Sequence, residues 1–131
     1  MTDILLATDA DWLVDDIEAA LGGSHLIHRV RSGHDVVPAI AEVDPALVLL
    51  DMQIGNMGGI AACLAIKHAE GMGSLEARPV MLLLDRDVDI FLAEEAGADG
   101  WLIKPLDPFR VLRAVERAVA GETTTEEPST A

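Results

Sequence analysis

The sequence predicts an α/β domain in which one parallel sheet of five strands is covered by helices on both faces. Short apolar runs alternate along the chain with segments of helical periodicity. The runs are continuously apolar and do not alternate with polar residues, which is typical of strands buried on both faces in a parallel sheet. Five strand–helix units in succession therefore favour an open, doubly wound sheet with right-handed crossovers.

The five predicted strands are short, and four of them are almost wholly apolar. They comprise residues 4–7, 26–30, 47–50, 80–84 and 101–103. The second run contains His28 and Arg29, so we expect this strand at an edge of the sheet.

The predicted helices are marked by apolar residues at helical spacing and by residues that begin or end helices. The first has an apolar residue at every fourth position from 13 to 21, and Gly22 and Gly23 follow it. The fifth begins with Asp107 as N-cap and Pro108 at the first helical position. The other three are expected at about residues 36–41, 60–68 and 88–96, and Gly97 ends the last of them.

Composition and charge limit the functions that the chain can have. Its 131 residues suffice for about one domain, here 1–120, followed by a polar, acidic tail at 121–131 that we expect to be disordered. The net charge of −14 argues against nucleic acid, because phosphate contacts need Lys and Arg. No run approaches the roughly 20 apolar residues of a membrane helix, and the acidic N-terminus shows no signal peptide. We expect a cytoplasmic protein whose partners are cations or other proteins.

The single cysteine and the four histidines suggest no catalytic arrangement. Cys63 excludes an internal disulfide and a Cys-rich zinc site, and its apolar helical surroundings favour a buried thiol. His25, His28, His34 and His68 are scattered, and we expect them at the surface or on an edge strand.

Three aspartates stand where predicted strands end. Asp9, Asp51 and Asp85 each follow an apolar run, and in open α/β sheets the ligand site lies outside the carboxyl ends of the strands. We therefore expect these side chains to converge on one edge of the sheet. Two simpler readings remain, since Asp51 is also compatible with a turn or a helix cap, and Asp9 with a cap like the one that we expect of Asp11.

The motifs around these residues resemble the receiver domain of bacterial response regulators (CheY-like). They are the acid after the first strand (Asp9), "LVLLD" ending at Asp51, and "GADGWLIKPLDP" at 97–108. The resemblance covers about residues 3–119 and implies a flavodoxin-like (βα)5 three-layer sandwich in two-component signal transduction. It implies that Asp51 accepts a phosphoryl group from a histidine kinase or a small phosphodonor, so we expect a phosphorelay protein and not an enzyme.

The resemblance also implies the remaining roles at the site. Magnesium would be held by Asp9, by Asp51 and by the backbone carbonyl of Gln53. Lys104 would contact the phosphoryl oxygens, and its bond to Pro105 would be cis, although an ordinary turn at this position is the simpler reading. These roles agree with general chemistry, because phosphoryl transfer needs positioning and charge neutralisation and Mg²⁺ prefers carboxylate oxygens and water.

The sequence departs from the receiver pattern at several positions, which predicts an atypical receiver. Thr8 replaces the first of two adjacent acids, so we expect a weakened magnesium site. Leu84 stands where receivers carry a switching Ser or Thr, Asp85 where they carry a small residue, and Trp101 at the aromatic switch position. Glycines replace the usual turn residues after Asp51, and we expect them to loosen that loop.

Because no effector domain is apparent, we expect output through protein contacts. Arg110, Arg113 and Arg117 recur at helical spacing and, with a partly exposed Trp101, would form a partner face for an acidic surface or a second copy. The simpler readings are a solvated helix face and a packed tryptophan. Three hypotheses remain: a stand-alone receiver phosphorylated on Asp51, a phosphorylation-independent pseudo-receiver, and another flavodoxin-like ligand binder or small enzyme. The third is disfavoured because no glycine-rich phosphate loop follows the first strand.

Overall fold

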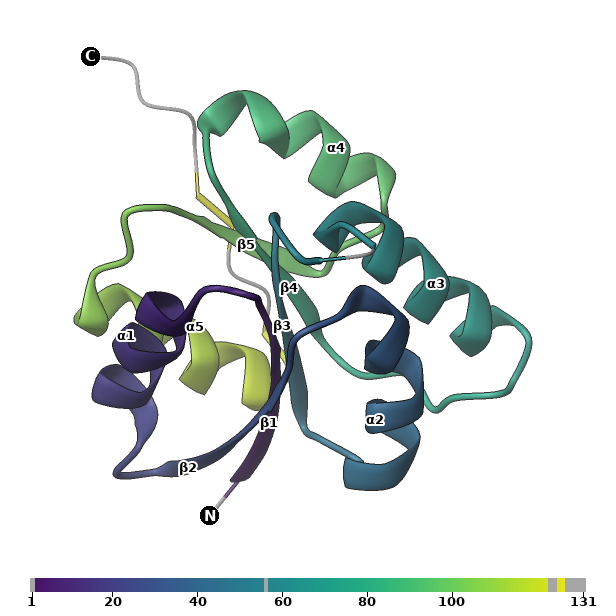
Figure 1. Cartoon of the computed structure of the whole chain (residues 1–131), viewed down its shortest axis with the longest axis horizontal. Coiled ribbons are helices and arrows are strands. Elements are labelled where there is room, and N and C mark those ends of the chain that lie inside the picture. Colours follow the sequence, from purple (N-terminus) through teal and green to yellow (C-terminus); the bar gives the residue numbers. More distant parts are fainter. Residues whose placement is uncertain (1, 56, 123–124, 127–131) are drawn as a thin grey trace.

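The chain folds around a single parallel sheet of five strands (Figure 1), described here from a computed structural model that covers residues 2–55, 57–122 and 125–126. The strand order is β2-β1-β3-β4-β5. The strands are β1 (Thr2–Ala7), β2 (His25–Val30), β3 (Leu47–Asp51), β4 (Val80–Leu84) and β5 (Gly100–Ile103). Each of the four neighbouring pairs is parallel. The predicted doubly wound class is confirmed.

Burial follows the place of each strand in the sheet. Every residue of β3 and β4 is buried, whereas most of β2 is only partly buried. This difference confirms that the second strand lies at an edge, where one side of the strand has no neighbour. The chain runs from β1 outward to β2 and then returns past β1 to β3, so the switch point lies between β1 and β3, where a ligand site is expected.

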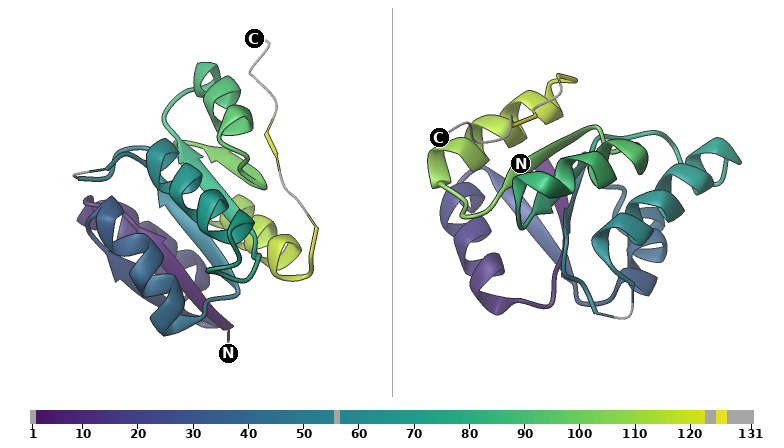
Figure 2. Two further views of the ribbon diagram at one scale, coloured as in Figure 1. Left: turned by 90° about the vertical axis from the view of Figure 1, so that its right-hand side faces the viewer. Right: turned by 90° about the horizontal axis from the view of Figure 1, so that it is seen from above.

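The helices cover the two faces of the sheet as separate layers (Figures 1 and 2). They are α1 (Asp11–Leu21), α2 (Val36–Val43), α3 (Gly59–Gly71), α4 (Ile90–Glu95) and α5 (Pro108–Val119). Side chains of α1 and α5 share one apolar cluster with the sheet, and those of α2, α3 and α4 share the other. The three-layer sandwich predicted from the sequence is therefore confirmed.

The helix ends agree with the prediction for α5 and differ from it for α4. Asp107 caps α5, since its Oδ1 accepts hydrogen bonds from the backbone N–H groups of Phe109 (2.8 Å) and Arg110 (3.2 Å). The fourth helix is shorter than predicted, because a 3-10 turn at Asp87–Asp89 precedes α4. Gly97, just beyond α4, has a positive φ of 78°, a conformation that favours glycine.

One local prediction is wrong. Asp11 does not cap α1: it is the first helical residue, and Ala10 takes the cap position. Its carboxylate instead binds the guanidinium groups of Arg29 (2.7 Å) and Arg31 (3.3 Å), which lower the pKa of Asp11. The place of His25 on the edge strand agrees with the prediction, and its buried side chain has Nε2 3.4 Å from the Glu116 carboxylate.

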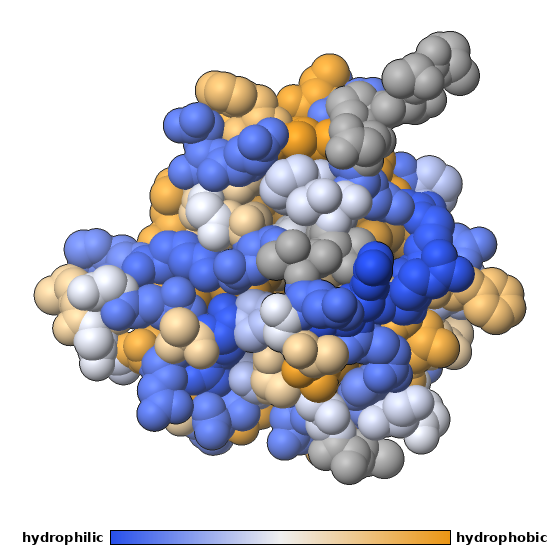
Figure 3. Space-filling model, turned by 180° about the vertical axis from the view of Figure 1, so that it is seen from behind, coloured by the Kyte–Doolittle hydropathy of each residue, from blue (hydrophilic) through white to orange (hydrophobic). Residues whose placement is uncertain are grey.

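The surface in Figure 3 is largely hydrophilic, with hydrophobic residues in separate groups between the polar ones. Among the described helices, none combines the length and the apolar character that a membrane crossing requires. Cys63 is fully buried, and burial raises the pKa of its thiol to about 11. This agrees with the plain buried thiol predicted from the sequence.

Within the tail that we expect to be disordered from residue 121, Glu126 is hydrogen-bonded to the edge strand β5. Disorder of the tail stays a prediction. Residues 123–124 and 127–131 of the predicted tail lie outside the described part of the chain.

Candidate functional site

Side chains from the ends of four strands meet at one edge of the sheet. Thr8 follows β1, Asp51 ends β3, Asp85 follows β4, and Lys104 follows β5. The Lys104 ammonium lies 2.5 Å from Asp51 Oδ1 and 2.8 Å from Asp85 Oδ1. The Thr8 hydroxyl donates a hydrogen bond of 2.7 Å to Asp51 Oδ2. The convergence of strand-end residues predicted from the topology is thus present for Asp51 and Asp85.

Gln53 connects the two carboxylates, a contact that sequence reasoning missed. Its backbone N–H donates to Asp51 Oδ1 (3.1 Å), and its side-chain amide donates to Asp85 Oδ2 (3.0 Å). Sequence reasoning had considered only the backbone carbonyl of this residue. A glutamine side chain carries no periodic or motif signal, so only the fold could have brought it to Asp85.

The lysine is held in its charged state by its partners. Burial alone lowers the pKa of Lys104, but the hydrogen bonds and charges of Asp51 and Asp85 outweigh it, and the net pKa lies above its usual value. Burial likewise raises the pKa of Asp85, while Lys104 and Gln53 outweigh it, and the net pKa lies below its usual value. Asp85 therefore carries a negative charge beside Asp51 throughout the neutral range.

The loop after Asp51 approaches the site closely, and this explains two of its glycines. A Cβ on Gly55 would lie 2.4 Å from Asp9 Oδ2, and one on Gly59 would lie 2.3 Å from the Asp51 carbonyl oxygen. The expected loosening of the loop stays a prediction, and these two glycines also have a steric role. They permit close approach of the backbone to both acids.

The residues expected to hold magnesium supply two carboxylates, those of Asp9 and Asp51. Asp51 is 1% exposed, whereas Asp9 is exposed. Within residues 2–55, 57–122 and 125–126, no group of three or more His, Cys, Asp or Glu side chains is arranged to hold a metal ion. Two carboxylates, one of them open to water, suit a hard cation that keeps several water ligands.

The two switch positions are both in the core. Leu84 is fully buried and Trp101 is 9% exposed, and both belong to the apolar cluster that α2, α3 and α4 form with the sheet. The Trp101 indole N–H donates to the backbone carbonyl of Glu126 (3.1 Å). The Lys104–Pro105 bond is cis, as the resemblance implied.

The partner face expected on α5 is only partly available. Trp101 is buried, which agrees with the simpler reading of a packed tryptophan and not with an exposed anchor. Arg110 is occupied by Glu126 and by the carbonyl oxygens of Ile103 and Pro105, each 3.1 Å away. Arg113 and Arg117 are exposed, which agrees with the simpler reading of a solvated helix face.

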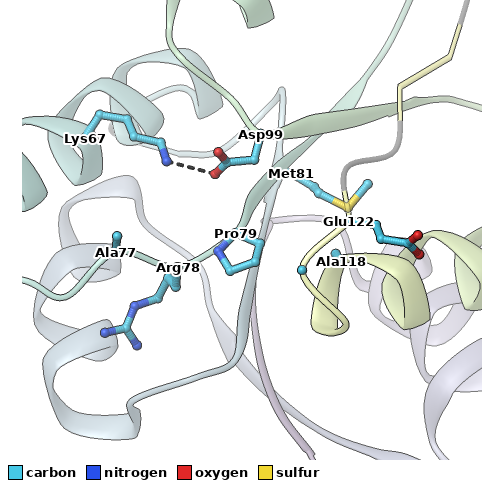
Figure 4. A pocket seen from close by; sticks show the side chains of 9 residues that line it. Lys67, Ala77, Arg78, Pro79, Met81, Asp99, Ala118 and Glu122 are labelled. Carbon is cyan, nitrogen blue, oxygen red and sulfur yellow. Dashed lines mark hydrogen bonds and ion pairs between the residues drawn. The ribbon is translucent and has the colours of Figure 1, made fainter.

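A second lysine bridge lies at the opposite end of the strands. Lys67 Nζ is 2.8 Å from Asp99 Oδ2 and 3.4 Å from Glu70 Oε1. Figure 4 shows Lys67 directed at Asp99 across the rim of a cavity of about 260 Å³, which Arg78, Pro79, Met81 and Glu122 also line. Burial alone lowers the pKa of Lys67, but Asp99 and Glu70 outweigh it and raise the net pKa.

The chain is similar to curated proteins over most of its length. The transcriptional regulatory protein AfsQ1 of Streptomyces coelicolor is 31% identical over 122 residues, which are 91% of this chain and 51% of that protein. The DNA-binding response regulator MtrA of Mycobacterium tuberculosis is 31% identical over 115 residues, 86% of this chain and 48% of MtrA. The chain thus spans about half the length of these relatives. No family model matches it.

Solved structures agree in fold. The receiver domain of a signal transduction histidine kinase from Syntrophus aciditrophicus superimposes with a TM-score of 0.80 at 25% identity, over 92% of each chain. The BeF3-activated N-terminal receiver domain of RstA from Klebsiella pneumoniae gives a TM-score of 0.77 at 26% identity, over 89% of this chain and 97% of that one.

Fold and site together define a signalling domain of the CheY-like type, with an aspartate at the end of β3 and a lysine after β5. The chain belongs to the receiver domains of response regulators, the proteins of two-component signalling. Such domains generally bind Mg²⁺ at the phosphorylation site and are not classical enzymes.

Proposed function

We propose that the chain is an atypical receiver in which Asp51 accepts a phosphoryl group from a histidine kinase or a small phosphodonor, and that it signals through a protein contact. The observation that carries this proposal is the position of Asp51. Its carboxylate ends the central strand β3, it lies 2.5 Å from the Lys104 ammonium, and it stands beside a loop with close-packed glycines.

The chemistry requires a nucleophile, charge neutralisation and a leaving group. A carboxylate oxygen of Asp51 attacks the phosphorus atom, the bond from phosphorus to the donor nitrogen or oxygen breaks, and the donor leaves with that electron pair. The product is an acyl phosphate on Asp51. Lys104 is placed to neutralise the added charge, but it must first weaken its contact with Asp85, which lies 2.8 Å away.

A magnesium ion, when bound, would neutralise part of the charge on the transferred group. Asp9, Asp51 and the Gln53 carbonyl are the groups of this chain that would hold it. Thr8 contributes a neutral hydroxyl where a second acid is usual, so the site carries one negative charge fewer. We therefore expect weakened affinity for the ion.

The test is intact-mass spectrometry after incubation with acetyl phosphate and magnesium. The parent should gain one phosphoryl group, and Asp51→Asn should gain none. Asp99→Asn is the matched control, because Asp99 is also a lysine-paired carboxylate but lies at the other end of the sheet. Labelling that survives in Asp51→Asn, or an unlabelled parent, would contradict the proposal.

One observation favours a second candidate, a phosphorylation-independent pseudo-receiver. Both oxygens of Asp51 accept hydrogen bonds from protein groups: Oδ1 from Lys104 and Gln53, and Oδ2 from Thr8. The buried carboxylate is thus satisfied without a cation or a phosphoryl group. This alternative would be supported if the parent stays unlabelled and if the parent and Asp51→Asn retain a protein partner equally well.

A further inference from the structure

A glutamate from beyond α5 lies against the exposed edge of β5. One Glu126 carboxylate oxygen, Oε1, accepts a hydrogen bond of 2.6 Å from the backbone N–H of Ile103. The other, Oε2, accepts one of 2.7 Å from Arg110 Nε, and Oε1 also contacts Arg110 Nη2. The described part of the tail is drawn in yellow beside β5 in Figure 1.

The backbone of the same residue is also bound. The carbonyl oxygen of Glu126 accepts a hydrogen bond of 3.1 Å from the indole N–H of Trp101. Glu126 therefore accepts hydrogen bonds from three residues. The donors are the indole N–H of Trp101, the backbone N–H of Ile103 and two guanidinium nitrogens of Arg110. Bidentate pairing of arginine with a carboxylate is among the stronger polar contacts in proteins, and the backbone contact adds recognition of an extended chain.

The donors are also held by contacts other than those with Glu126. Trp101 and Ile103 belong to β5, and Trp101 is buried in the core. Arg110 is held by hydrogen bonds from its guanidinium to the carbonyl oxygens of Ile103 and Pro105. A preformed set of donors lowers the ordering cost of binding.

This donor set adjoins the candidate phosphorylation site. Ile103 immediately precedes Lys104 in the chain, and a cavity of about 640 Å³ runs between Glu126 and the carboxylate of Asp85. Its wall carries the cations of Arg86, Lys104 and Arg110 and the carboxylates of Asp85, Asp87 and Glu126. The donor set and the candidate phosphorylation site therefore open onto the same cavity.

We propose that Trp101, Ile103 and Arg110 form a recognition site for a glutamate in an extended peptide segment, which the chain's own Glu126 occupies in cis. The tail thereby competes with any acidic segment of a partner that docks on this edge of the sheet. The inference does not depend on phosphorylation of Asp51. It concerns contacts that are present without a phosphoryl group.

The first test uses NMR on the full chain with Glu126→Ala. Loss of the carboxylate should shift the Trp101 indole and Ile103 amide resonances and accelerate hydrogen exchange at both groups. Glu122→Ala is the matched control, since the carboxylate of this tail glutamate lies 3.9 Å from Arg117 Nε, and Arg117 is about two turns along α5 from Arg110. Unchanged Trp101 and Ile103 signals in Glu126→Ala would overturn the proposal.

The second test supplies the ligand in trans, as a fluorescent peptide with the sequence of residues 120–131. It should bind full-length Glu126→Ala about tenfold more tightly than the parent, whose site is occupied. Adding Arg110→Ala to Glu126→Ala should abolish this gain, whereas adding Arg113→Ala should preserve it. A peptide that itself carries Glu126→Ala should bind full-length Glu126→Ala no more tightly than it binds the parent. Equal binding to parent and Glu126→Ala, or a gain that survives Arg110→Ala, would refute the site.

Discussion

The two lysines of the chain, Lys67 and Lys104, each bridge two carboxylates, and they do so at opposite ends of the sheet. At the Lys67 bridge, the carboxylates also bind backbone. Asp99 accepts from the N–H of Val80 (2.9 Å) and Glu70 from that of Arg78 (3.3 Å). This bridge therefore ties α3 to the starts of two strands.

At the Lys104 bridge, the partners differ. Asp51 accepts from a side-chain hydroxyl and from the loop amide of Gln53, and Asp85 accepts from a side-chain amide. The site opens onto a cavity lined by Asp85 and Lys104. Lys104 can therefore change its carboxylate partners without disrupting hydrogen bonds at the start of a strand. The comparison teaches that the same ion-pair chemistry serves structure at one end and is available for signalling at the other.

The largest effect that separates the two bridges should be on phosphoryl uptake. Lys104→Met removes the cation beside Asp51, and labelling by acetyl phosphate should slow by about 100-fold, as for loss of other charge-stabilising groups. Lys67→Met should label at the parent rate. Both rates are measured by mass spectrometry over time. Equal rates for the two variants would remove the functional distinction.

The free energy of unfolding should fall when Lys67 is removed. Lys67→Met leaves Asp99 and Glu70 partly buried without their cation, so the free energy of unfolding should fall by about 2 kcal/mol. Urea denaturation measures this change, with Arg113→Met as a control for removing an exposed cation from a helix. A loss no larger than that of the control would show that the Lys67 bridge contributes no structural support.

An acid in place of Thr8 should strengthen Mg²⁺ binding at the Asp51 site. Thr8→Asp adds a carboxylate beside Asp51, and Mg²⁺ affinity, measured by calorimetry, should rise roughly tenfold. The protein without the ion should be less stable, because two buried carboxylates then repel each other. Thr8→Ser keeps the hydroxyl and should resemble the parent. Unaltered affinity in Thr8→Asp would separate Thr8 from the metal site.

The smallest effect concerns pH. Because Lys104 and Gln53 hold the pKa of Asp85 below its ordinary value of 3.8, ionised Asp85 stabilises the fold above that pH and loses this contribution as pH falls through its lowered pKa. The parent should exceed Asp85→Asn in unfolding free energy by less than about 1 kcal/mol near neutrality. Denaturation at several pH values should show this gap closing in acid, and a gap that widens there would contradict the assignment.

Most of the fold could be predicted because the strands are buried on both faces. Continuous apolar runs such as residues 80–84 stand out in the sequence, and strand ends then fix which acids meet. The sequence placed Asp51 and Asp85 at one edge for this reason, whereas the role of Lys104 followed only from the resemblance to receiver domains. It could not reveal the link between Gln53 and Asp85, because both belong to loops whose conformation depends on tertiary contacts.

Side-chain burial was the weaker part of the prediction. The sequence left both a partly exposed and a packed Trp101 open, since a strand residue near an edge can face either inward or outward, and the side chain packs into the core. The contacts of Glu126 were not predicted, because composition cannot show that a single glutamate meets Arg110 and two N–H donors. Such contacts arise between segments that carry no shared sequence pattern.

The most direct test of the central claim follows the two lysines themselves. With ¹⁵N-labelled lysine, the side-chain ammonium signals of Lys67 and Lys104 can be observed at low temperature and assigned with Lys67→Met and Lys104→Met. Beryllofluoride with magnesium mimics the phosphoryl group on Asp51. The account predicts that the Lys104 signal moves while that of Lys67 stays in place. A stationary Lys104 signal after saturation with the mimic would contradict the claim that this bridge, and not the other, responds to phosphorylation.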